Sequence, residues 1–152
     1  MQLRAKKAPI EDLKILYEEC NMLCKKYDAT LLLNGSLEIA ESFNCTKIHL
    51  SAKAVMDRQK ELPKSLIVCA SCHNEIEIRK AISIGVNFIV LSPVNLTATH
   101  PNATPLGWSE FSRLCSISSI PVFALGGMSK SDLTLARKNG AQGIAAIRSF
   151  WN

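Results

Sequence analysis

The sequence predicts an α/β protein of the (β/α)8 TIM-barrel type, apparently lacking the first strand and helix, with seven parallel strands. Short apolar runs alternate with helix-like segments along all 152 residues, the pattern of parallel strands joined by helical crossovers. Turns suited to phosphate follow the last two runs, where barrels commonly bind phosphate. An open doubly wound sheet fits the same alternation and stays the alternative architecture.

Seven segments have the character of strands. The first alternates apolar and polar residues, and the others are short, mostly apolar runs typical of buried parallel strands. Gly35 closes the second run and Pro93 stops the fifth. We expect strands at residues 1–6, 30–34, 47–50, 65–70, 87–92, 120–125 and 143–147.

Six helices are expected between these strands. Pro9 suits a first helical turn, and Asn74 begins a helix that Gly85 ends. Pro63 helps to end another helix. The expected helices cover residues 9–27, 37–43, 52–60, 74–84, 108–114 and 129–139, and residues 94–106 form an irregular loop.

The segment from Ile120 to Asp132 contains the clearest candidate site. An apolar run ends in Gly126 and Gly127, after which Ser129 and Asp132 have the spacing of a capping box. Glycines let backbone amides approach a ligand, and a helix N-terminus favours an anion. The segment therefore suggests a phosphate or carboxylate site, although a simple strand-to-helix turn would have the same residues.

Composition restricts the class of protein. The chain carries a net charge of +5 without a basic run interleaved with aromatic residues, so a small anionic ligand explains the charge as well as nucleic acid does. Neither a membrane-spanning run nor a signal-peptide core is visible. We therefore expect a cytoplasmic protein, without nucleic-acid or membrane partners, whose six cysteines are mostly buried thiols.

Motifs in a fixed order resemble the thiamine phosphate synthase/TenI superfamily of (β/α)8 barrels, most closely the domain found behind Nudix hydrolases. The similarity runs nearly end to end and starts at the family's second strand, so residues 1–152 are expected to form an N-terminally incomplete barrel domain. The matching segments are residues 2–6, 32–34, 48–50, 71–75, 91–93, 97–99, 105–107, 124–127 and 140–148.

The resemblance implies a site at the carboxyl ends of the strands, with the following residues. Gly126, Gly127, Ile147 and Arg148 would hold a thiazole phosphate. Arg4, Lys6, Thr97 and Thr99 would contact a pyrimidine diphosphate, and Gln2, Asn34 and Ser71 would line the pyrimidine pocket. The implied reaction joins the two precursors with release of pyrophosphate.

The sequence departs from this pattern where the synthase reaction needs Mg²⁺. Gly35 follows Asn34 in place of the usual aspartate, and residues 51–53 contain no acidic side chain. No metal ligand is therefore assigned, and Mg²⁺ is expected only if synthase activity is retained. Three functions remain open: a transferase, a TenI-like thiazole tautomerase with His73 or His100 as the acid/base group, and a catalytically degenerate domain that binds a phosphorylated ligand and regulates a Nudix-type hydrolase.

Two further expectations can be tested by a structure. Cys69, Cys72 and His73 spell the attachment pattern of c-type haem, but a strand end in a chain without an export signal argues for buried thiols. Without a first strand, an inner sheet edge stays unpaired. We expect the first and last strands either to meet directly or to be covered by another chain, such as a second copy or an attached Nudix domain.

Overall fold

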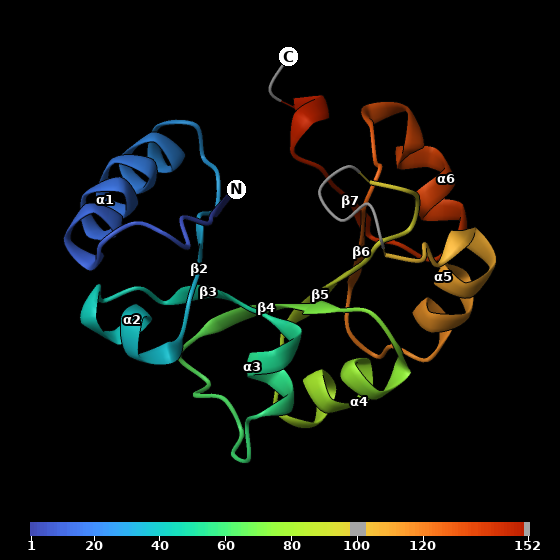
Figure 1. Cartoon of the computed structure of the whole chain (residues 1–152), viewed down its shortest axis with the longest axis horizontal. Coiled ribbons are helices and arrows are strands. Elements are labelled where there is room, and N and C mark those ends of the chain that lie inside the picture. Colours follow the sequence, from blue (N-terminus) through green and yellow to red (C-terminus); the bar gives the residue numbers. More distant parts are fainter. Residues whose placement is uncertain (98–102, 151–152) are drawn as a thin grey trace.

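A seven-stranded parallel sheet forms the centre of the protein. The computed structural model describes residues 1–97 and 103–150, and its strands curl into an incomplete ring (Figure 1). The strands follow one another in the sheet in sequence order, as they do in a barrel and not in a doubly wound sheet, whose order reverses. They are β1 (Gln2–Leu3), β2 (Leu32–Asn34), β3 (Lys47–Leu50), β4 (Ile67–Cys72), β5 (Phe88–Leu91), β6 (Val122–Leu125) and β7 (Gly143–Ala145).

Helices cover the outside of this ring (Figure 1). Three begin with a polar cap just after a strand: the side chains of Ser36, Ser51 and Asn74 each accept a hydrogen bond from the backbone amide three residues on. The α-helices are α1 (Ile10–Lys26), α2 (Leu37–Ser42), α3 (Ala52–Met56), α4 (Glu75–Ser83), α5 (Gly107–Ser116) and α6 (Leu133–Lys138). Two short 3-10 helices, η1 (Lys130–Asp132) and η2 (Arg148–Phe150), lie near the C-terminal end.

The hydrophobic core lies between the convex face of the sheet and the helices. Alternate residues of neighbouring strands, including Leu33, Ile48 and Val68, are fully buried there together with Phe111 of α5. The other face of the same strands carries Asn34, His49 and Ser71, because successive side chains in a strand point to opposite faces. The sheet therefore has one apolar face for stability and one concave face with polar groups.

Several predicted boundaries were wrong. β1 ends at Leu3 instead of Lys6, β4 lies two residues later than predicted, and β7 ends at Ala145. The helix predicted to reach Lys60 ends at Met56, because Val55 is its one buried residue and residues 57–61 are polar or charged. Helical propensity alone does not maintain a short helix that buries no apolar face.

The ring is open between its first and last strands. Among the described residues β1 pairs only with β2 and β7 only with β6, so of the two expected arrangements the direct meeting of the first and last strands is not found. Figure 1 shows the gap between α1 on one side and η2 with α6 on the other. Coverage of this gap by another chain stays a prediction.

Candidate functional site at the carboxyl ends of the strands

The turn after β6 is built from two glycines for a steric reason. Gly126 and Gly127 have φ values of +99° and +66°, which L side chains rarely adopt. A Cβ on Gly126 would lie 2.7 Å from the Cα of Pro93, and one on Gly127 would lie 2.7 Å from the carbonyl oxygen of Leu96. The turn and the loop after β5 thus touch through their backbones, and Val94 N donates to Leu125 O at 2.9 Å.

This turn forms one wall of a pocket of about 230 Å³. The opposite wall comes from the segment after β7, where Ser149 Oγ donates to Met128 O at 3.0 Å and ties the two walls together. The pocket lining includes Thr97 and all four residues predicted to hold phosphate, Gly126, Gly127, Ile147 and Arg148. Gly127 and Arg148 therefore share one rim, and the binding of phosphate there stays a prediction.

The chain after the pocket contains the predicted capping box. The Asp132 carboxylate accepts hydrogen bonds from Ser129 N at 2.8 Å and from Ser129 Oγ at 2.7 Å. Because Asp132 already uses the Ser129 amide, that amide is not offered to a ligand. A bound anion would instead depend on the Arg148 guanidinium and on the glycine turn.

A group of polar side chains lies on the concave face of the sheet, on strands β1 to β4 and so away from the pocket after β6 and β7. Gln2 Nε2 lies 2.6 Å from His49 Nδ1, and His49 Nε2 lies 2.8 Å from Ser71 Oγ. The parallel register places Asn34 beside His49 on the same face. The structure thus brings together the three residues predicted for the pyrimidine pocket, Gln2, Asn34 and Ser71, around His49.

His49 is the functional candidate that sequence reasoning missed. Its side chain is only 3% exposed. Burial, reinforced by the cation of Arg4, lowers its pKa from 6.5 to about 4, so the ring is neutral at pH 7. The available signal was a histidine between Ile48 and Leu50, whose apolar side chains lie on the opposite face of the strand.

The structure also shows where the other residues predicted to contact substrate lie, and their contact with substrate stays a prediction. Arg4 and Lys6 follow β1 and are exposed, and Arg4 is close enough to act on His49. Thr97 lines the pocket beside the glycine turn. Thr99 and His100 lie outside the described residues.

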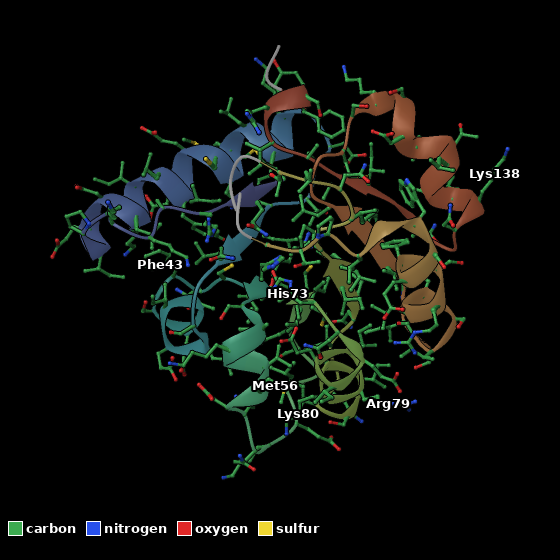
Figure 2. All side chains as sticks on the ribbon, turned by 45° about the vertical axis from the view of Figure 1, so that its right-hand side comes forward. Phe43, Met56, His73, Arg79, Lys80 and Lys138 are labelled. Carbon is green, nitrogen blue, oxygen red and sulfur yellow. The ribbon has the colours of Figure 1, made fainter. Side chains whose placement is uncertain are left out.

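His73, the remaining acid/base candidate, is held at the end of β4. Its Nδ1 lies 2.7 Å from the carbonyl oxygen of Ser92, which only accepts, so Nδ1 carries a proton. When the ring is neutral, Nε2 is therefore the basic atom. His73 is exposed, and Figure 2 draws it near the centre of the view, with Arg79 and Lys80 of the following helix farther from the centre.

The residues at the expected Mg²⁺ position do not fit a metal. Gly35 lacks a side chain, Ser51 caps α3, and Lys53 is cationic. Asp57 lies at the far end of α3. In the described part of the chain, no group of three or more His, Cys, Asp or Glu residues could hold a metal ion.

Cys69 and Cys72 are structural thiols. Both are fully buried, and burial raises the pKa of each to about 12. A thiol that is neither exposed nor ionised does not attach haem or exchange disulfides readily. The structure thus supports the buried-thiol interpretation of this motif.

Fold and site together define a class: a barrel-type α/β protein with a pocket and a cluster of polar side chains at the carboxyl ends of its strands. Among residues 1–97 and 103–150, no helix is long and apolar enough to cross a membrane.

Comparison with known proteins identifies the family. A family model described as "Thiamine monophosphate synthase" matches residues 1–150, and the chain belongs to this family. It is 35% identical over 151 residues to the "Putative thiamine-phosphate synthase 2" of Aquifex aeolicus, covering 99% of this chain and 81% of that protein.

Two further comparisons agree. The chain is 32% identical over 136 residues to a thiamine-phosphate synthase of Prochlorococcus marinus subsp. pastoris, covering 88% of this chain and 39% of that protein. A solved thiamine phosphate pyrophosphorylase from Pyrococcus furiosus superimposes with a TM-score of 0.78 and 24% identity, covering 96% of this chain and 71% of that chain. The latter comparison supports the fold. The attachment of a Nudix hydrolase domain stays a prediction.

Proposed function

We propose that this chain binds phosphorylated thiamine precursors, a thiazole phosphate and a pyrimidine diphosphate, at the carboxyl ends of its strands. The observation that carries the proposal is that Gly126, Gly127, Ile147 and Arg148 line the same pocket. Arg148 supplies a permanent cation with several N–H donors, which suits the oxygens of a phosphate group. Membership of the thiamine monophosphate synthase family supports the same ligands.

The polar group on the concave face is the proposed place of the pyrimidine. Gln2 and Ser71 offer an amide and a hydroxyl there, and Arg4 and Lys6 add two cations next to Gln2. These cations are suited to the diphosphate. In the transferase reaction the carbon–oxygen bond to the diphosphate breaks, pyrophosphate leaves, and the thiazole nitrogen forms the new bond to that carbon.

Two alternatives have specific observations in their favour. The absence of an acidic residue at position 35 and at positions 51–53 favours a domain that binds these ligands without joining them and regulates an attached hydrolase. The oriented Nε2 of His73 favours a thiazole tautomerase, which needs one group to move a proton. As partners of the whole domain, we propose a second copy or an attached domain covering the open edges of β1 and β7.

Binding and turnover experiments distinguish these functions. Isothermal titration with thiazole phosphate and with pyrimidine diphosphate should give saturable binding of both. Incubation with both ligands and Mg²⁺, followed by chromatography, then separates a transferase, which forms thiamine phosphate, from a binding domain, which does not. Loss of a ring proton of the thiazole to D₂O would identify the tautomerase. If one of the two ligands does not bind, the proposed function is refuted.

A matched pair of variants tests the pocket itself. Arg148→Ala removes the pocket cation and should weaken thiazole phosphate binding at least about tenfold, the loss of one charge-assisted hydrogen bond. Arg137→Ala removes the same charge from the exposed last turn of α6 and should change binding little. Equal effects of the two substitutions would show that general charge, and not this pocket, attracts the ligand.

A further inference from the structure

A hydrogen-bonded chain of three side chains crosses the concave face, from Gln2 on β1 through His49 on β3 to Ser71 on β4. The central histidine is buried, whereas Gln2 is exposed and Ser71 is half-buried. We infer that His49 is a positioning residue, which fixes the direction of these hydrogen bonds so that the Ser71 hydroxyl donates to the bound substrate.

The direction follows from the chemistry of the groups. The amide nitrogen of Gln2 can only donate, so His49 Nδ1 must accept at this contact. A neutral imidazole carries one N–H, which is therefore on Nε2. The low pKa of His49 keeps the ring in this neutral form at pH 7. Nε2–H then donates to Ser71 Oγ across 2.8 Å.

This direction determines what Ser71 offers to a ligand. Its oxygen already accepts from His49, and within the described ranges His49 is the only group hydrogen-bonded to the Ser71 side chain. The hydroxyl proton is thus available to an acceptor on the substrate. With the opposite tautomer, Ser71 would donate to His49 and would offer only lone pairs to the substrate.

The substrate atom that meets Ser71 must consequently be an acceptor. Here the inference rests on the proposed function: a ring nitrogen of an aminopyrimidine is such an acceptor. The carbonyl oxygen of Gln2 is not used in the contact with His49, and it matches the exocyclic amino group, which is a donor. His49 thereby arranges one donor and one acceptor without touching the substrate.

The first experiment measures the tautomer on the ligand-free protein. Long-range proton–nitrogen correlation spectra of the chain labelled with ¹⁵N-histidine report which ring nitrogen is protonated, and His49→Gln assigns the signal. We expect His49 to show Nε2–H and a bare Nδ1, unchanged from pH 8 to about pH 5.5. An Nδ1–H tautomer, or a charged ring at pH 7, overturns the inference.

The second experiment measures binding of the pyrimidine diphosphate to the variants His49→Leu, Ser71→Ala, the double variant and His49→Gln. The two single substitutions should each weaken binding up to about tenfold, and the double variant should be no weaker, because His49 acts through Ser71. His49→Gln places an amide N–H near the position of Nε2–H and should retain most of the affinity.

Inorganic pyrophosphate provides the control, since its affinity should be the same for all of these variants. Additive losses in the double variant, or equal losses in His49→Gln and His49→Leu, overturn the inference. If the wild-type chain does not bind the pyrimidine diphosphate, the proposed function is refuted. The tautomer measurement then decides on its own whether His49 sets the direction of Ser71.

Discussion

The glycine turn at the pocket allows a quantitative test of the close contact between two loops. In Gly126→Ala the new methyl group would lie 2.7 Å from the Cα and 2.8 Å from the Cβ of Pro93, and 3.1 Å from the amide nitrogen of Val94. These are mostly backbone atoms, which cannot rotate away. The φ of +99° adds strain for any residue with a Cβ.

Two contributions determine the expected loss of stability. Backbone strain at positive φ costs about 1–2 kcal/mol, and a steric overlap of this kind costs about 1–3 kcal/mol more. The sum of about 2–5 kcal/mol is a large part of the roughly 5–15 kcal/mol that stabilises a typical domain.

Gly85→Ala is the matched control. Gly85 has a similar φ of +85°, but an added Cβ would have no atom within 4 Å, so this substitution carries the strain without the overlap. Urea unfolding followed by circular dichroism measures both variants. With an m-value of about 2 kcal/mol/M, an overlap of about 2 kcal/mol lowers the midpoint of Gly126→Ala about 1 M below that of Gly85→Ala. Equal midpoints would show that the loop after β5 is not in contact with the turn.

Three further predictions concern single side chains. Asp132→Ala removes both hydrogen bonds to Ser129 and should cost about 1 kcal/mol in urea unfolding; an unchanged midpoint would contradict the capping role. His49 has a folded pKa of about 4 and an ordinary value near 6.5, so protons favour the unfolded chain, and roughly 3 kcal/mol of stability should be lost as the pH falls from about 6.5 to 4. In His49→Gln this part of the pH dependence should disappear, and its persistence would assign the effect to other groups. Cys69 and Cys72 should react with a thiol reagent only on unfolding, and rapid labelling of the native protein would show that β4 is more accessible than the structure indicates.

Local features of this protein are predictable from sequence because they depend on neighbouring residues. The alternation of strands and helices, the caps at Ser51 and Asn74, and the capping box of Ser129 and Asp132 all involve groups within a few positions of one another. The alternation, the helix start at Asn74 and the capping box were correctly predicted, whereas the cap at Ser51 was not predicted. The helix after Ser51 was predicted too long, since its end depends on burial and not on local pattern.

The candidate site was predictable only in part. The glycine turn is visible in the sequence, and the family resemblance indicated its partner Arg148. His49 was not predicted, because a lone histidine in an apolar strand has no local partner and is usually a core residue whose hydrogen bonds are satisfied.

Sequence alone thus determined the kind and order of the elements, together with the turn that is able to approach a phosphate. Tertiary structure decided which side chains meet: the parallel register brings Gln2, His49 and Ser71, which lie 47 and 22 residues apart, onto one concave face. It also decided that, in the part of the chain that the structure describes, β1 and β7 do not pair with each other. Both results depend on the curvature and register of the whole sheet, which no short segment of the chain specifies.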